Sequence, residues 1–419
     1  MEYVNFALFG IFSFYIWKKY QRINLAIFYS SIWTFSALIG IVYYNSDSYR
    51  EGLYGISLLP FIVLFSLLFI LLLPLSRNEE EIEIVDGNIK WLSLFMAYIG
   101  IISVYPFIET SIDFAKSIVD GRFMLLGSMY EDIVSGHAES FIKYSKLGGF
   151  LYVHSYYWSN LSLVLAFFYY GQRNHNRLIL IGLLMNSLLP VARSLAIGNR
   201  TMLMWYLIFI ISLYLLYRNY FSLQAKKNVK KTMTITFCIA LAIIASLSIS
   251  RYIIGKNMTN EETSSAIYQY TAESMYNFNE FLFHDTGRLN GVWTFNPLLH
   301  NIGLSDVGLD DLSRREYVEQ HLSSPSFIFY TGFGEFWGDF GPIGAYIITI
   351  LISIIFSNFI PKRIMKLEDI ALLSIYLYFV GNSLFYFCYK TSFANIYAPL
   401  AFFIAAKLSR GKTNQIKTL

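Results

Sequence analysis

Residues 58–75 read LLPFIVLFSLLFILLLPL, and this stretch decides the class of the fold. It carries no charge and, as a helix, it is long enough to cross most of the roughly 30 Å hydrocarbon core of a bilayer. Because its apolar residues are continuous rather than alternating with a period of two, it predicts a helix and not a barrel strand.

Similar apolar runs recur along the chain. Hydrophobic residues make up 55% of the 419 and charged residues 14%, whereas a soluble domain has roughly 25% charged residues. We therefore predict an all-α polytopic integral membrane protein, a single transmembrane domain over 1–419 with about eleven spanning helices. The net charge of +4 is too small to indicate a nucleic-acid partner. The predicted spans lie near 3–17, 24–44, 53–75, 91–109, 147–170, 178–197, 200–217, 232–253, 336–360, 369–388 and 392–408.

Basic residues give the orientation of these spans. Since short basic loops stay in the cytoplasm, their alternation predicts an external N-terminus and a cytoplasmic C-terminus. The two long segments, 110–146 and 254–335, are then external loops. The aromatic stretch Ser264–Phe283 predicts an amphipathic helix lying in the membrane interface. The basic loops are Lys18–Arg22, Arg77–Lys90, Arg173–Arg177, Arg218–Lys231, Lys362–Lys366 and the tail from Lys407.

Two arginines interrupt the apolar region that follows residue 178. Arg193 lies in the run Leu188–Ala196, and Arg200 follows seven residues later. An arginine within the membrane costs about 2.5–3.5 kcal/mol on insertion scales and usually faces a polar cavity or a ligand path. Pro190 and Gly198 could open the helix there. The planar guanidinium suits bidentate phosphate binding, so the pair predicts a pyrophosphate site. The alternative is an arginine that snorkels to the water boundary.

The second long segment supplies a further set of polar side chains. If that segment is helical, Glu280, His284 and Arg288 share one face at i, i+4 and i+8. A carboxylate, an imidazole and a guanidinium together suit acid–base chemistry and anion binding, although a solvated loop also carries such residues. Arg251, at a helix end, and His300 are further candidates for binding.

Two acidic residues, Glu335 and Asp339, flank Trp337 at the outer end of a span. They either bind a sugar hydroxyl or simply end a helix in water. Gly334 and Gly338 form a GxxxG pair, which predicts close packing. The chain has no GxxxxGK[ST] phosphate loop, no HExxH and no Cys/His cluster, so we expect no nucleotide-driven pump, no metal and no other cofactor.

Three stretches carry a resemblance to a known family. Ser326–Gly344, with its Thr331, aromatic residues and Asp-Phe-Gly-x-x-Gly from Asp339, resembles a segment of the bacterial Wzy-type oligosaccharide repeat-unit polymerases. Gly291–Phe295 resembles the Gly-x-x-Thr-Phe of their large periplasmic loop, and Arg193–Thr201 resembles a basic segment at a helix–helix turn. The resemblance is clearest over 190–345.

The resemblance implies a fold and a reaction. The fold is a helical lipid-dependent glycosyltransferase with a large periplasmic loop, in the bacterial inner membrane. The reaction moves the growing glycan from undecaprenyl pyrophosphate to the non-reducing end of another lipid-linked unit. Its partners are undecaprenyl-pyrophosphate-linked oligosaccharide, membrane lipids, a flippase and a chain-length regulator. The alternatives are an O-antigen ligase-like transferase and, in another class, a lipid-linked oligosaccharide flippase.

The same resemblance suggests roles for the candidate residues. Arg193, Arg200 and Arg288 would hold the two pyrophosphates, and His284 or Glu280 would polarise the acceptor hydroxyl. We therefore expect Arg193, Arg288, His284 and Glu280 to be catalytic. The expected substrate-binding residues are Arg200, Arg251, His300, Tyr330, Glu335 and Asp339.

Overall fold

The structure is a computed structural model of residues 1–419. At 201, 247–255, 311–312, 364, 393 and 411–416 the backbone alone is described. The described residues are all except 47–48, 50–53, 77–82, 86–88, 90, 121–143, 173–174, 197–200, 256–270, 310, 327, 329, 359–363, 385–392 and 417–419.

The chain divides into two compact units. Unit 1 comprises Met1–Glu79, Met258–Pro361 and Tyr376–Thr391, and unit 2 comprises Glu80–Asn257, Lys362–Ile375 and Ser392–Leu419. The expectation of one transmembrane domain over 1–419 stays a prediction.

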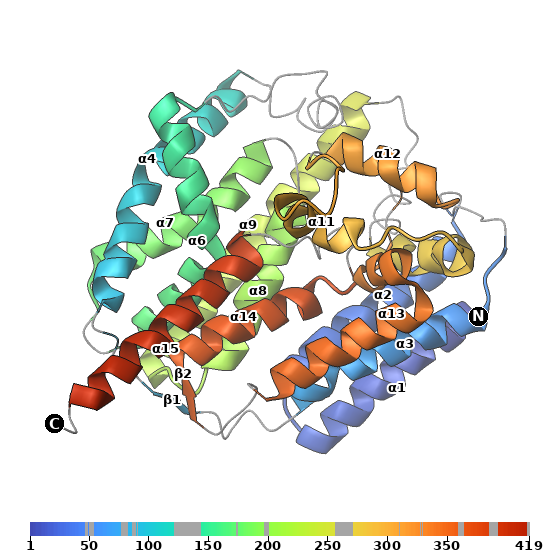
Figure 1. The fold of residues 1–419 in the computed structure, drawn as a ribbon, viewed down its shortest axis with the longest axis horizontal. Helices are drawn as coiled ribbons and strands as arrows, with labels where there is room; N and C mark the ends of the chain where they lie inside the picture. Colours follow the sequence, from blue (N-terminus) through green and yellow to red (C-terminus); the bar gives the residue numbers. More distant parts are fainter. Residues whose placement is uncertain are drawn as a thin grey trace. The chain divides into compact units, whose positions relative to one another are not determined.

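Unit 1 is built from long apolar helices and the segment 271–330. Helices α1, α2, α3 and α13 pack along one another (Figure 1). Residues 271–280 are also helical. The other elements are α1 (Glu2–Tyr20), α2 (Leu25–Tyr44), α3 (Leu58–Leu72), the 3-10 turns η1 (Leu73–Ser76) and η4 (Leu282–His284), α11 (Val292–Asn301), α12 (Asp311–His321) and α13 (Gly332–Ser357).

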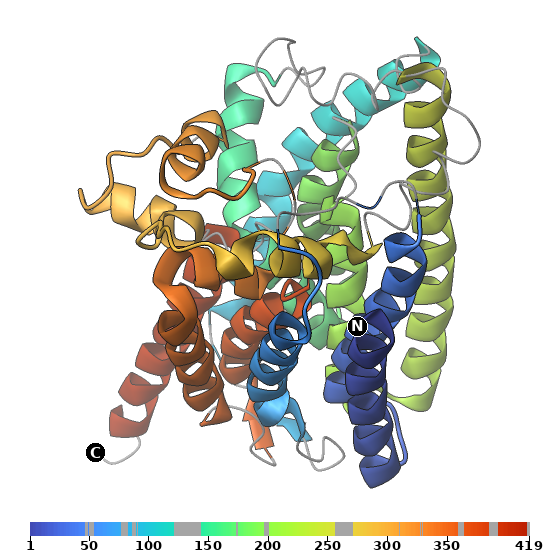
Figure 2. The same ribbon diagram turned by 90° about the vertical axis from the view of Figure 1, so that its right-hand side faces the viewer.

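Unit 2 is built around three helices, α4, α6 and α7, that pack against one another. Figure 2 shows α9 as the long helix at the right-hand edge. Helix α14 (Leu367–Gly381) has residues in both units. The elements are β1 (Glu83–Val85), α4 (Leu92–Val119), α6 (Lys146–Gly171), α7 (Arg177–Ala196), α8 (Thr201–Tyr217), α9 (Leu223–Gly255), β2 (Ile364–Lys366), the π-helical turn η5 (Phe393–Tyr397) and α15 (Ala398–Ile416).

Two glycines allow α4 and α7 to approach closely. A Cβ atom built on Gly182 would lie 2.7 Å from the Cα of Gly100, and one built on Gly100 would lie 3.2 Å from the Cα of Gly182. Small residues at such a crossing let two backbones come together in a membrane, where van der Waals packing drives helix association. This crossing fixes α7, and with it Arg193, against α4.

Each of the eleven predicted spans falls on a helix of the structure. Among the described residues, six helices are long and apolar enough to cross a membrane, so the chain is a helical protein of the multi-pass membrane type. The count of about eleven spans stays a prediction. The six are Leu25–Tyr44, Leu58–Ser76, Leu92–Val119, Arg177–Ala196, Leu223–Ser246 and Gly332–Ser357.

The structure also holds a small sheet that the all-α prediction did not include. Strands β1 and β2 pair in parallel, with Ile84 opposite Met365. They come from two loops, Arg77–Lys90 and Lys362–Lys366, that the charge pattern assigns to the same side of the membrane. Their pairing requires a common side, and which side of the membrane it is stays a prediction.

Three local predictions are wrong. Helix α4 continues to Val119, into the segment 110–146 that we predicted as a loop, and the external side of that loop stays a prediction. Of the predicted interfacial helix Ser264–Phe283, residues 264–270 lie outside the described residues. Residues 272–280 are buried in unit 1, whereas a helix lying in the membrane interface would expose its polar face. Pro190 does not open α7, which runs through it to Ala196.

Candidate functional site

Arg193 lies in the last turn of α7 and packs on two tyrosine rings, Tyr144 just before α6 and Tyr152 within it. Its guanidinium carbon is 4.5 Å from the ring centroid of Tyr152 and 5.8 Å from that of Tyr144. The two rings stack on each other, with centroids 4.9 Å apart and planes 22° apart. A cation held over aromatic faces is stabilised by the ring quadrupoles, so Arg193 has a defined position rather than a free end.

The start of α6 holds these rings in place. Ser145 caps the helix and accepts a hydrogen bond of 3.0 Å from the backbone N–H of Gly148. The hydroxyl groups of Tyr144 and Thr110 lie 2.8 Å apart, in hydrogen-bond contact. Burial raises the pKa of the Tyr144 phenol to about 12. The phenol is therefore neutral at physiological pH and does not neutralise Arg193.

Among the described residues, Arg193 forms no ion pair with a carboxylate. An arginine that is half-buried in an apolar helix normally has an acidic partner, because an uncompensated cation there is costly. The planar fork of an arginine held in this way has the chemistry to bind a phosphate group. We refer to five residues together as the Arg193 cluster. They are Thr110, Tyr144, Tyr152, Arg193 and Glu109, which is described next.

Glu109 belongs to this cluster and was not predicted. It lies on α4 next to Thr110, whose hydroxyl contacts that of Tyr144, and its Oε2 lies against Gly148 of α6, one helical turn from Tyr144 and from Tyr152. The sequence signal was an acidic residue at the end of an apolar run, at the boundary of the predicted span 91–109. We treated it as a boundary residue, because nothing in the sequence places it beside Arg193.

The predicted residue Glu280 lies in unit 1 with its side chain buried, at 1% exposure. Tyr49 donates a hydrogen bond to its carboxylate. Burial raises the pKa of the Tyr49 phenol far above its usual range, so this donor stays protonated. The neighbouring Asn279 joins the same loop, since it accepts from the N–H of Ser57 at 3.0 Å and donates to the Ser57 carbonyl at 2.7 Å.

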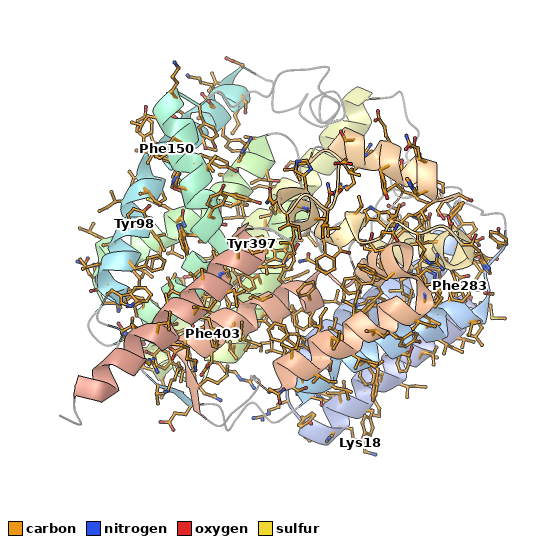
Figure 3. The ribbon with its side chains drawn as sticks, viewed as in Figure 1. Lys18, Tyr98, Phe150, Phe283, Tyr397 and Phe403 are labelled. Atoms are coloured by element: carbon orange, nitrogen blue, oxygen red, sulfur yellow. The ribbon has the colours of Figure 1, made fainter. Side chains whose placement is uncertain are left out.

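His284 follows in the 3-10 turn η4 and stacks on Tyr54, with ring centroids 4.3 Å apart. Its Nε2 is buried and has no hydrogen-bond partner within the part of the chain that is described. Phe283, labelled in Figure 3, stacks on Trp337 with centroids 5.0 Å apart. An imidazole with one buried nitrogen unused and its ring held by stacking is available to a ligand.

The predicted helical face of Glu280, His284 and Arg288 does not exist. The helix ends at residue 280, and Arg288 lies in irregular backbone beyond η4. The guanidinium donates to its own loop, to the carbonyl of Asp285 at 3.1 Å and to that of Gly287. The guanidinium of Arg288 lies against Gly341, where α13 is broken and φ is 72°. A Cβ atom built on Gly341 would lie 2.6 Å from Nε of Arg288.

Asp339 holds the loop that contains Arg288. Its two carboxylate oxygens accept the backbone N–H groups of Trp293 at 2.9 Å and Thr294 at 2.8 Å, which caps α11. The carbonyl of Asp339 accepts from the N–H of Asn290 at 3.1 Å. A Cβ on Gly338 would lie 2.7 Å from the ring of Trp293, so the predicted close packing is present. Much of the Asp-Phe-Gly segment therefore shapes this loop.

The remaining predicted binding residues are described to different extents. Glu335 is buried at 1% exposure, and Tyr330 is buried and donates to the carbonyl of Pro325 at 3.0 Å. His300 is exposed at the end of α11. Arg251 lies in α9, where the backbone alone is described, and Arg200 lies outside the described residues.

Comparison with family models, with curated proteins and with solved structures gives no significant match.

Proposed function

We propose that the chain is a membrane glycosyltransferase that polymerises lipid-linked oligosaccharide repeat units. The glycan on undecaprenyl pyrophosphate would be transferred to the non-reducing end of another lipid-linked unit, at the outer face of the bacterial inner membrane. The observation that carries the proposal is Arg193, a guanidinium in an apolar helix with aromatic support and no carboxylate partner among the described residues.

Arg193 would stabilise the leaving group. As the bond from the anomeric carbon to the pyrophosphate breaks, negative charge grows on the phosphate oxygens. A fixed guanidinium in a site of low dielectric stabilises that charge more strongly than water does. The basic-loop pattern places the end of α7 on the external side, where the lipid-linked substrates would be.

Unit 1, taken by itself, holds a second group of side chains suited to bind an anion and a sugar. Arg288 lies on the loop 285–294 with its NH1 bonded to carbonyl groups, a geometry that orients the rest of the fork. His284 has a buried nitrogen available to a ligand. The aromatic residues around it, Tyr54, Phe283 and Trp337, offer faces on which sugars stack.

The proposal is tested by the glycan ladder of cells that lack this chain and carry either wild type or Arg193→Ala. We expect wild type to restore the polymer and Arg193→Ala to leave single repeat units attached to their final acceptor. Polymer of normal length that stays unattached would indicate a ligase. Repeat units trapped in the cytoplasmic leaflet would indicate a flippase.

A further inference from the structure

Glu109 has an unusual environment within the Arg193 cluster. One carboxylate oxygen, Oε2, is buried and has no hydrogen-bond partner among the described residues, while the residue as a whole is half-buried. No ion pair joins Glu109 to a basic residue in the described chain. An unsatisfied buried polar oxygen costs about 1–3 kcal/mol, so a role outside stability is indicated.

Gly148 provides the space for this carboxylate. A Cβ atom built on Gly148 would lie 1.7 Å from Oε2 of Glu109, which is far inside van der Waals contact. The next glycine of α6 differs, because a Cβ on Gly149 would only touch the Cβ of Tyr144, at 3.7 Å. Any side chain at position 148 would therefore displace the carboxylate, whereas a methyl group at position 149 fits.

The cluster thus holds a cation and a carboxylate that do not neutralise each other. Both groups lie against one face of the start of α6. Oε2 of Glu109 lies against Gly148, and the rings that support the guanidinium, Tyr144 and Tyr152, lie one helical turn to either side of that glycine. A glycosyl transfer needs both charges close together. The cation stabilises the departing pyrophosphate, and a base must take a proton from the hydroxyl that attacks the carbon bonded to that pyrophosphate.

We propose that Glu109 is the catalytic base of the transfer, an inference that rests on the proposed polymerase function. The acceptor oxygen forms a bond to the anomeric carbon and its proton passes to the Glu109 carboxylate. The bond from that carbon to the pyrophosphate breaks, and its electron pair leaves with the phosphate oxygen beside Arg193. Glu280 is less suited to this role, since it is buried at 1% exposure and already accepts a hydrogen bond from Tyr49.

The test uses the purified full chain in liposomes with a synthetic repeat unit on undecaprenyl pyrophosphate. Glu109→Gln keeps the shape and removes the base, so we expect kcat to fall by about 10²–10⁴-fold, with KM within about threefold of wild type. Glu109→Asp should restore part of kcat.

Two matched variants separate catalysis from folding. Gly148→Ala displaces the carboxylate and should lower kcat by at least about tenfold, a loss of about 1.4 kcal/mol in transition-state stabilisation. Gly149→Ala adds the same methyl group one position along and should leave kcat unchanged. Full activity of Glu109→Gln beside active wild type would overturn this inference and leave the polymerase proposal standing. Inactive wild type would overturn both.

Discussion

Replacing Arg193 by methionine should abolish polymerisation without unfolding the protein. The side chain gains about 0.5–2 kcal/mol from each of the Tyr152 and Tyr144 rings. Against this, a guanidinium in an apolar span costs up to about 2.5–3.5 kcal/mol. The two contributions nearly cancel, so Arg193→Met should change the free energy of unfolding by no more than about 1–2 kcal/mol.

The expected effect on the reaction is much larger. Two charge-assisted hydrogen bonds to a phosphate contribute about 1.5–3 kcal/mol each, and their loss corresponds to a decrease of about 10²–10⁴-fold in kcat/KM. Arg193→Lys keeps the charge but not the planar fork, and should lose about 10–100-fold.

The assay combines thermal unfolding in detergent with rates of polymer formation in liposomes. If Arg193→Met polymerised within about tenfold of wild type, the guanidinium would not be a phosphate ligand. If the variant instead unfolded, Arg193 would be a structural residue and the stability comparison above would be wrong.

Three further substitutions, one of them with a matched control, test the surroundings of Arg193 and Arg288. Gly341→Ala should lower activity by displacing Arg288. Its control is Gly303→Ala, also at φ 72° but with open space around it, which should cost only backbone strain of about 1–2 kcal/mol. Equal activities of the two variants would refute the contact between Gly341 and Arg288. Gly182→Ala should lower the stability by about 1–3 kcal/mol, because the added methyl group meets the backbone of Gly100, which cannot move aside as a side chain can. An unchanged unfolding temperature would contradict the close crossing of α4 and α7. Asp339→Ala should lower the free energy of unfolding by about 1–2 kcal/mol, because it removes the cap of α11. The loss should appear as faster proteolysis of the loop 285–294, and unaltered proteolysis would argue against the cap.

The helical fold was predictable because the bilayer imposes it. Each apolar run had to satisfy its backbone hydrogen bonds internally, so every predicted span fell on a helix. The ends were less predictable, since polar residues continue a helix beyond the hydrocarbon core. Helix α9 begins at Leu223 instead of at the predicted residue 232, because four lysines form its first turns. Helix α4 extends past Glu109 to Val119.

The candidate site was predictable only in part. Arg193 stood out because a charge interrupts an apolar run, and this needs no knowledge of its neighbours. Its partners Tyr144 and Glu109 lie on other elements, and only the packing of α4, α6 and α7 brings them together. Arg288 was misplaced on a helix, because the periodicity at i, i+4, i+8 ignored Gly287 and Gly291.

The most direct test of the central claim is to supply the purified chain alone, in liposomes, with a repeat unit linked to undecaprenyl pyrophosphate. We predict a ladder of glycans that differ by one repeat, with one undecaprenyl pyrophosphate released for each bond formed. Repeat units that cross the bilayer without lengthening, or that stay unchanged, would contradict the assignment of this chain as a polymerase.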